Sequence, residues 1–368
     1  MTERESEGIS SAPERVSEDA MRAASLREMA GRNASEVASA VDPVGKAIND
    51  PLSLSEGEIR DLLTADHIER NTQRIRSLKE SLVGNRVLVR GSIEISNCCR
   101  MSCNYCGMSR GNKDLARYRL DLPSVKERIR LAKEIGVDLI HISSAEDPQF
   151  PLEEICETIA FAKDQGMETV LVLGMRKREE YEQMFAAGAR KYTMKIESSD
   201  PDVFRKATNY LLEKRKREIA TLREVGFDVG SGVIIGLPDQ TTSHLVSDIR
   251  FLQELKPTMS SASVFIPNAA AVFRDQPKGD QTTAFRFNVL MRMLLRDPVP
   301  RIPASSSFGN ALQQKLLETS ANVVSINLTP DEFAQNYSMY GGQDRLIASA
   351  KKIQALVGEA GLITNLRV

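Results

Sequence analysis

Apolar positions recur in two alternating rhythms along most of the chain. Short runs rich in Val and Ile, such as "VLVRGSIEIS", predict strands, whereas segments such as "PSVKERIRLAKEIG" repeat apolar residues every three or four positions, as amphipathic helices do. Several helical segments end in Gly or Pro, which stop helices. We expect eight strands, at residues 87–96, 137–143, 169–173, 191–196, 229–235, 261–266, 299–303 and 322–327.

The regular alternation of these strands and helices indicates the fold class. Eight βα units within roughly 280 residues match a closed α/β barrel better than an open doubly wound sheet. We therefore expect a (β/α)8 TIM-type barrel over residues 87–368. Reactive side chains of such a barrel lie on the loops that follow the carboxyl ends of the strands.

The segment before the barrel has two different patterns. Residues 1–45 are rich in Ser, Glu, Ala and Arg and contain few large apolar side chains, so burial can offset little ordering entropy, and we expect a mobile arm. Residues 46–86 turn helical: "SLSEGEIRDLLTA" combines a Ser followed three positions later by Glu with apolar Ile59, Leu62 and Leu63. We expect these residues to form an N-terminal helical extension of the barrel.

Composition excludes several functional classes. The chain has 368 residues, 41% of them hydrophobic, and 49 basic against 50 acidic residues give a net charge of −1. This balance provides no long-range field to attract nucleic acid or an anionic membrane, so we expect partners among small molecules and proteins. No apolar run approaches the length of about 18–20 residues that spans a bilayer, and we expect a cytoplasmic protein.

Four of the five cysteines lie within "EISNCCRMSCNYCG", directly after the first expected strand. Cys99, Cys103 and Cys106 follow a Cys-x3-Cys-x2-Cys spacing, which lets three thiolates converge from one loop. A structural zinc site usually takes four ligands, whereas an iron–sulfur cube accepts three and leaves one iron open. Zinc, and free thiols that merely cluster, stay open as weaker alternatives. Cys98 is an alternative ligand in a Cys-x4-Cys-x2-Cys register, and Cys156 fits the apolar face of a helix.

Longer motifs carry a family resemblance from about residue 87 to the end of the chain. The matching stretches are "CRMSCNYCGMSRGNKDLARYRL", "ISSAEDP", "MKIESSDPDVFRK", "VGSGVIIGLPDQT", "RIPASSS" and "ANVVSINLTPDEF". They resemble the radical S-adenosylmethionine (SAM) superfamily, within it the group of biotin synthase, the [FeFe]-hydrogenase maturase HydE and methylornithine synthase, and most of all the maturase.

The resemblance implies two cofactors, a [4Fe–4S] cluster on Cys99, Cys103 and Cys106, and SAM on its open iron. A free α-amino acid carries an ammonium and a carboxylate, and Glu197 and Arg215 could supply the matching charges. Each has a simpler explanation, as a solvated helix cap for Glu197 and as part of an exposed basic helix face for Arg215. By resemblance, the residues beside SAM are Tyr105, Ser144, Glu146, Glu197, Arg215, Gly232 and Gly236.

The function that the resemblance implies is reductive cleavage of SAM to a 5′-deoxyadenosyl radical, which acts on a small substrate in the barrel lumen. It implies an electron donor such as flavodoxin or ferredoxin, and it also points to proteins of a maturation pathway as partners. The strand assignment places five candidate substrate residues at the upper rim, namely Lys195, Ser305, Ser306, Asn327 and Thr329.

Departures from the family pattern limit the substrate assignment. Ala145 replaces the usual Gly, the loop "FIPNAAAVFRD" lacks the group's usual motif, and the auxiliary-cluster cysteines of biotin synthase are missing. Sulfur insertion is therefore disfavoured. The alternatives are an amino-acid mutase like methylornithine synthase, and a non-catalytic iron–sulfur scaffold, which would not need Glu146, Glu197 or Arg215.

Overall fold

A single parallel sheet organises the computed structural model, which describes residues 42–341 and 349–367. The strand order in the sheet is β6-β5-β4-β3-β2-β1-β7, and all neighbouring strands run parallel. The strands are β1 (Leu88–Ser96), β2 (Leu139–Ser144), β3 (Glu168–Val172), β4 (Lys191–Thr193), β5 (Asp228–Ile235), β6 (Met259–Val264) and β7 (Val323–Asn327).

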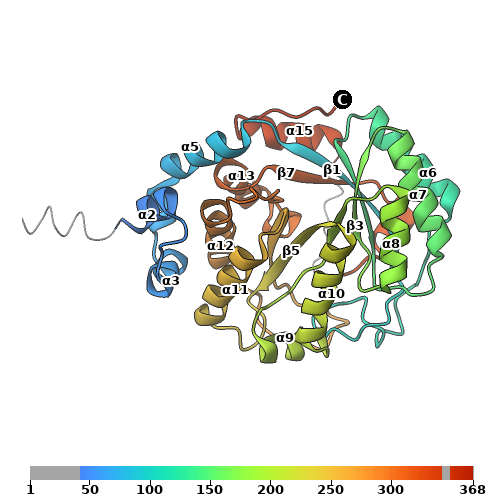
Figure 1. Ribbon diagram of the computed structural model, residues 1–368, viewed down its shortest axis with the longest axis horizontal. Coiled ribbons are helices and arrows are strands. Elements are labelled where there is room, and N and C mark those ends of the chain that lie inside the picture. Colours follow the sequence, from blue (N-terminus) through green and yellow to red (C-terminus); the bar gives the residue numbers. More distant parts are fainter. Residues whose placement is uncertain (1–41, 342–348, 368) are drawn as a thin grey trace, which may run out of the picture.

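Helices cover the outer face of this curved sheet, as Figure 1 shows for α6, α7 and α8 on one side and for α10, α11 and α12 on the other. Those that follow the strands are α6 (Leu122–Glu134), α7 (Leu152–Asp164), α8 (Arg178–Ala187), α9 (Pro201–Thr208), α10 (Leu212–Val225), α11 (Thr242–Leu255), α12 (Gln281–Leu294), α13 (Asn310–Thr319), α14 (Asp331–Ala334) and α15 (Ala350–Glu359).

Alternation along each strand separates the helix-covered core from the inner side of the sheet. On β1, Val89, Ile93 and Ile95 are buried in the main hydrophobic cluster. The intervening positions are polar, and Ser92 lies in register with His141 of β2, with Ser92 Oγ 3.4 Å from His141 Nδ1. The sheet therefore has one apolar face against the helices and one inner face that carries polar groups.

The strand expected at residues 299–303 is absent from the sheet. Its place is taken by two isolated bridges, Met259 with Arg301 and Pro303 with Val323. Pro300 and Pro303 have no N–H to donate, so a regular ladder cannot form. Arg301 N still donates to Thr258 O at 2.9 Å and Ala304 N to Val323 O at 2.8 Å. The α/β class and a seven-stranded parallel sheet are observed, while eight regular strands are not.

The fourth strand is shorter than the sequence predicts. It ends at Thr193 instead of residue 196, although Met194 N still donates to Gly230 O. Glu197 then adopts a left-handed backbone conformation with φ 58° and forms a lone bridge with Val233 of β5. This backbone conformation is uncommon for a residue other than Gly, and the sequence does not indicate it at Glu197.

The N-terminal helices are α2 (Pro43–Asn49), α3 (Glu56–Thr64), α4 (His67–Arg70) and α5 (Thr72–Val83). The Ser55 and Glu58 capping box opens α3 as the sequence predicts. On α5, the buried Lys79 donates to Leu317 O at the carboxyl end of α13. Residues 1–41 of the expected mobile arm lie outside the described residues.

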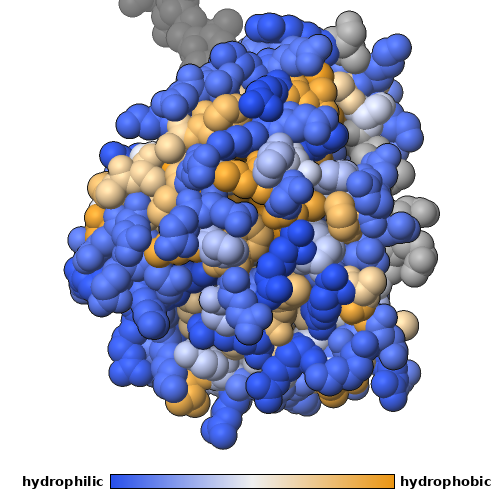
Figure 2. Space-filling view, turned by 90° about the vertical axis from the view of Figure 1, so that its right-hand side faces the viewer, coloured by the Kyte–Doolittle hydropathy of each residue, from blue (hydrophilic) through white to orange (hydrophobic). Residues whose placement is uncertain are grey.

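The face of the molecule seen in Figure 2 is mostly hydrophilic. Hydrophilic side chains cover most of that face, and apolar ones are visible mainly in the furrows between them. Within the described ranges, the structure has no helix with both the length and the apolar character needed to cross a bilayer.

Candidate active site

The cysteine loop leaves the carboxyl end of β1 and is fixed by three other segments. Arg100 N donates to Glu146 O after β2, at 3.0 Å. Asn104 N donates to Ala207 O of α9 at 2.8 Å, and Asn104 O accepts from Phe273 N at 2.8 Å. These backbone bonds hold the loop at the end of the sheet where the sequence predicted the site.

Burial of the sulfur atoms raises the pKa of all three expected ligands. The pKa of Cys106 rises to about 12 and that of Cys103 still higher, in both cases mainly by desolvation. The pKa of Cys99 is also raised by burial. Charge on any of these thiolates raises the pKa of its neighbours, so the thiolate forms are stable together only with a cationic centre between them.

The geometry of the donors distinguishes the kind of centre. Among residues 42–341 and 349–367, no three His, Cys, Asp or Glu side chains converge closely enough for a single metal ion. A cube does not require such convergence, because each of its cysteines binds a different iron. Three cysteines on one loop match the number of protein ligands that such a cube takes when one iron stays open.

The other two cysteines have separate environments. Cys98 Sγ lies 3.6 Å from Tyr118 O, and Cys98 N donates to Ser96 Oγ at 3.1 Å. Cys156 is on α7 and packs partly buried against the main core. The register in which Cys99 is the first ligand stays a prediction.

Tyr105 connects the cysteine loop to Glu197. Its hydroxyl donates to Glu197 Oε1 at 3.3 Å, and its ring packs against a small cluster that includes Phe265 and Phe273. Burial, and then the charge of Glu197, raise the pKa of Tyr105 well above its usual value. Tyr105 therefore stays neutral and remains a hydrogen-bond donor.

Glu197 and Arg215 approach each other across Lys195. The Lys195 ammonium lies 3.1 Å from Glu197 Oε2 and donates to Ser263 Oγ at 3.1 Å, while Arg215 Nη1 donates to Lys195 O at 3.2 Å. Glu197 Oε2 is thus held by the ion pair with Lys195 and accepts no hydrogen bond, and Arg215 Nε is a buried atom without a hydrogen-bond partner. The hydrogen bond from Tyr105 places Glu197 beside the cysteine loop.

The segment after β2 is occupied by internal contacts. Ser144 Oγ donates to Ala145 O at 2.6 Å. Glu146 Oε1 accepts from Arg100 Nε at 2.8 Å, and Glu146 Oε2 accepts from Met175 N at 3.0 Å. Glu146 thus ties the cysteine loop to the end of β3, and its contact with SAM stays a prediction.

Both glycines expected near the adenosine are required by close packing within the chain. A Cβ on Gly232 would lie 2.0 Å from Ser261 O of the neighbouring strand. Gly236 has φ 89°, and a Cβ there would lie 2.2 Å from Gly279 Cα. Their contact with a nucleoside therefore remains a separate prediction.

Sequence reasoning missed Glu94, which contacts the end of the last strand, β7. This residue of β1 is only 2% exposed, and its carboxylate accepts from Asn327 Nδ2 at 3.4 Å and Thr329 Oγ1 at 3.5 Å. Glu94 N also donates to Thr329 Oγ1 at 2.9 Å. The signal in the sequence is an acidic residue within an otherwise apolar run that precedes the cysteines.

Two more predicted substrate residues, Ser305 and Ser306, directly follow the predicted strand at 299–303. Ser305 Oγ lies 2.9 Å from Ser307 Oγ, and Ser306 begins a short 3-10 turn, Ser306–Phe308. The predicted substrate residues are thus distributed over the ends of β4 and β7 and residues 305–306.

A second missed group joins the loops after β4 and β5. Asp248 of α11 accepts at Oδ1 from Ser199 N at 2.5 Å and from Ser199 Oγ at 2.6 Å. Gln240 accepts from Gly236 N at 2.7 Å and donates to Ile234 O at 3.0 Å, with Asp248 Oδ2 at 3.5 Å. The fully buried Asp248 is detectable in sequence only as an acid on an apolar helix face.

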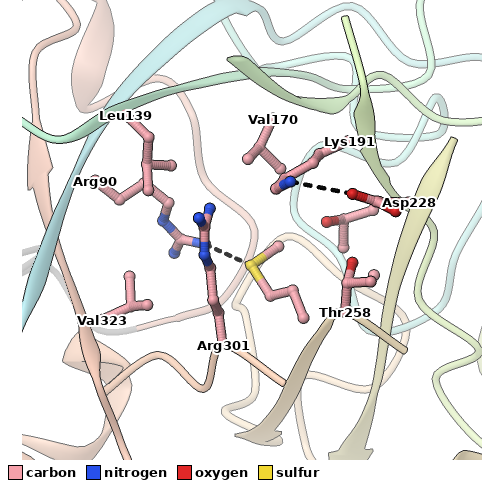
Figure 3. Close-up of a pocket in the computed structure, with 11 residues that line it drawn as sticks. Arg90, Leu139, Val170, Lys191, Asp228, Thr258, Arg301 and Val323 are labelled. Atoms are coloured by element: carbon pink, nitrogen blue, oxygen red, sulfur yellow. Dashed lines mark hydrogen bonds and ion pairs between the residues drawn. The ribbon is translucent and has the colours of Figure 1, made fainter. Parts of the chain in front are cut away.

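The opposite end of the sheet is closed (Figure 3). Side chains from the starts of the strands fill it and leave about 10 Å³ of space, enough for about one water molecule. Lys191 pairs with Asp228 at 3.1 Å, and Arg90 Nη1 lies 3.8 Å from Met259 Sδ. A substrate must therefore be held at the carboxyl end, where the cysteine loop lies.

Three thiols on the loop after β1, with the Lys195–Glu197 ion pair after β4, agree with what comparison with known proteins finds. Residues 93–252 match the model of the Radical SAM superfamily. A curated relative is 36% identical over 270 residues, which cover 72% of this chain and 77% of the relative. The chain belongs to the radical SAM superfamily and is an enzyme of that class.

That relative is the [FeFe] hydrogenase maturase subunit HydE of Thermotoga maritima. A 3-methylornithine synthase of Methanosarcina barkeri is 22% identical over 307 residues, covering 81% of this chain and 87% of the relative. The chain is thus HydE-like in sequence.

Solved structures support the fold alone. Methylornithine synthase (PylB) aligns with a TM-score of 0.77 at 20% identity, covering 88% of this chain and 97% of that one. The maturase HydG from Carboxydothermus hydrogenoformans aligns with a TM-score of 0.74 at 21% identity, covering 95% and 83%.

Proposed function

We propose that Cys99, Cys103 and Cys106 hold a [4Fe–4S] cluster, that SAM binds its open iron, and that the enzyme acts on a small substrate as a HydE-like protein. The observation that carries this proposal is Arg215 Nε, a buried donor without a hydrogen-bond partner, together with the nearby Glu197, whose Oε2 is held only by the ion pair with Lys195. A buried donor without a partner is costly unless a ligand completes it.

The methionine part of SAM has the complementary groups. Its ammonium can donate to Glu197, and its carboxylate can accept from Arg215. Tyr105 stays protonated and fixes Glu197 by donating to the other carboxylate oxygen. Once bound, the cluster and SAM supply one-electron cleavage of the sulfonium bond and a 5′-deoxyadenosyl radical for attack on the substrate.

The remaining residues have positioning and enclosing roles in this proposal. Asp248 and Gln240 hold the loops that carry Glu197 and Gly236, and Glu146 holds the cysteine loop. The 301–303 segment serves as the eighth strand that closes the barrel, since it bonds to β6 and β7. A closed barrel excludes water and oxygen from the reacting groups.

For the substrate we retain Lys195, Ser305, Ser306, Asn327 and Thr329. Glu94 orients Asn327 and Thr329, and Lys195 can hold a carboxylate of the substrate. An external electron donor such as flavodoxin or ferredoxin is needed, and maturation-pathway proteins fit a HydE-like role. An iron–sulfur scaffold has no use for a buried Arg215 Nε without a hydrogen-bond partner, and a methylornithine-synthase-like mutase has weaker support because that relative is less similar.

The test is SAM affinity of anaerobically reconstituted protein, measured by equilibrium binding. Glu197→Gln and Arg215→Gln should keep the cluster and weaken SAM binding by about 1–3 kcal/mol, the cost of a lost charge-assisted hydrogen bond. Arg217→Gln, on an exposed position of the same helix, is the matched control and should bind SAM normally. Unchanged affinity in both site variants would return Glu197 and Arg215 to purely structural roles.

A further inference from the structure

The proposed function requires one electron from outside for each SAM cleaved. Apart from the three ligands, the sequence has only Cys98 and Cys156, too few to hold a second cluster as an internal relay. The electron must therefore cross the surface nearest to Cys103. That surface is formed by the segments that bond directly to the cysteine loop.

Two segments line this surface beside Asn104. Asn209, at the end of α9, donates to Ser102 O and to Asn104 Oδ1, both at 2.8 Å. From the other side, Phe273 N donates to Asn104 O at 2.8 Å. Figure 1 shows α9 and the start of α10 at the foot of the molecule, beside the teal loop that follows β1.

Both segments expose a large apolar side chain next to these contacts. Leu211 is 49% exposed and Val272 is 70% exposed. In the described part of the chain, large hydrophobic side chains with such exposure are Leu52, Leu211, Val272 and Ile363. Two of these four therefore border the cysteine loop, although the loop occupies a small part of the surface.

Basic residues outnumber acidic ones in the segments beside these apolar positions, although the exposed Glu213 and Asp275 lie two and three residues from Leu211 and Val272. Residues 100–110 contain two arginines and no acidic residue, and residues 214–217 read "KRKR". Arg205 and Lys214 are exposed on either side of Asn209. Because the whole chain has a net charge of −1, this local excess of cations is a feature of this surface and not of the composition.

We propose that the surface around Asn104, with Leu211 and Val272 at its centre and Arg205 and Lys214 at its edge, docks an acidic one-electron carrier protein. This inference rests on the proposed function and adds the place and charge of the partner. The carrier is oxidised by one electron and the cluster is reduced by one, so no other reactant is needed. An apolar centre with a charged rim is the usual anatomy of a protein docking site.

The experiment uses full-length reconstituted protein and, as the probe, an acidic plant-type [2Fe–2S] ferredoxin. Arg205→Glu, Lys214→Glu and Val272→Asp are compared with Lys351→Glu, an exposed control on α15 at the other end of the molecule. Calorimetric titration gives ferredoxin affinity, and 5′-deoxyadenosine formation is followed separately with reduced ferredoxin and with dithionite.

Each of the three substitutions should weaken ferredoxin binding about tenfold and lower the ferredoxin-driven rate to a similar degree. Added salt should weaken wild-type binding, because exposed charges are screened. The dithionite-driven rate and the Lys351→Glu control should stay within about twofold of wild type. Wild-type affinity in all three variants would overturn the proposal, as would an equal loss with dithionite.

Two further outcomes separate this proposal from others. Loss of a dimer in Val272→Asp, seen by sedimentation with ferredoxin binding unchanged, would make the surface a contact between two copies and overturn the docking proposal. Absence of 5′-deoxyadenosine in wild type with dithionite would overturn the proposed function itself. Ferredoxin affinity would still test the docking surface in that case.

Discussion

At the scale of single residues, the side chains around the cysteine loop divide by whether their bonds are complete. Glu146 has both carboxylate oxygens bonded within the chain, and the Asn327 amide donates to Glu94 Oε2 and accepts from Thr329 N. Glu197 Oε2 is held by the ion pair with Lys195, whereas Arg215 Nε has no hydrogen-bond partner. Arg215 therefore has a donor to spare for a ligand, and Glu146 has both oxygens occupied.

Single cysteine replacements should separate ligands from bystanders. Cys99→Ala, Cys103→Ala and Cys106→Ala should each lose the cluster, since a cube held by two thiolates is poorly retained. Cys98→Ala and Cys156→Ala should keep about four irons per chain, because these thiols face Tyr118 and the α7 core. Iron content measured after anaerobic reconstitution distinguishes the cluster ligands from the other cysteines. Retention in Cys99→Ala with loss in Cys98→Ala would show that the other register is correct.

Substrate residues should separate two activities that wild type couples. Asn327→Ala and Ser305→Ala should lower product formation from substrate, while slow uncoupled release of 5′-deoxyadenosine continues because the proposed SAM site lies on other strands. The readout is 5′-deoxyadenosine with reductant alone, compared with product in the presence of a substrate-containing extract. If the uncoupled release disappears in both variants with the cluster intact, these residues serve the cofactor.

At the scale of elements, the positions of the strands followed from apolar patterning, and the differences have local causes. The segment at 299–303 forms isolated bridges instead of a strand because Pro300 and Pro303 lack the N–H groups that a ladder needs, and both prolines are visible in the sequence. Beyond the early end of β4 the backbone is left-handed at Glu197, which pattern reasoning cannot anticipate because the residue is not Gly or Asn. The link from α11 to the β4 loop through Asp248 depends on tertiary contacts alone.

Asp248 should make the stability of this link depend on pH. Burial raises its pKa from 3.8 to about 6, against the opposing effect of the Ser199 hydrogen bonds. Because the folded pKa is above the unfolded one, the stabilising contribution is complete below about pH 4 and is lost as pH rises through about 6. The loss amounts to about 3 kcal/mol for a shift of about two units.

Asp248→Asn removes this titration and keeps an oxygen that accepts from Ser199. Urea unfolding of both reconstituted proteins should show the variant gaining stability relative to wild type, by up to about 3 kcal/mol, as pH rises from 4 to 7. Glu254→Gln, an acid-to-amide change at an exposed position of the same helix, is the matched control for general effects on α11. A stability difference between Asp248→Asn and wild type that does not change with pH would contradict the buried-carboxylate interpretation.

At the scale of the whole molecule, the architecture places all proposed chemistry at one end. The starts of the strands are filled by Arg90, Lys191, Arg301 and their neighbours, while the cysteine loop and the Glu197–Arg215 pair lie at the carboxyl ends. The N-terminal helices add support from outside, with the buried Lys79 donating to the end of α13. The sequence predicted this division because the cysteines directly follow the first strand, whereas the support from Lys79 could be seen only in three dimensions.

The central claim is that this chain cleaves SAM by reduction at a cysteine-bound cluster. The most direct test is anaerobic quantification of 5′-deoxyadenosine and methionine from reconstituted wild-type protein with SAM and dithionite, using Cys103→Ala as the control. We expect both products in equal amounts from wild type and neither from the variant. Wild-type protein with a full complement of iron and bound SAM that yields no 5′-deoxyadenosine would contradict the account and favour an iron–sulfur scaffold.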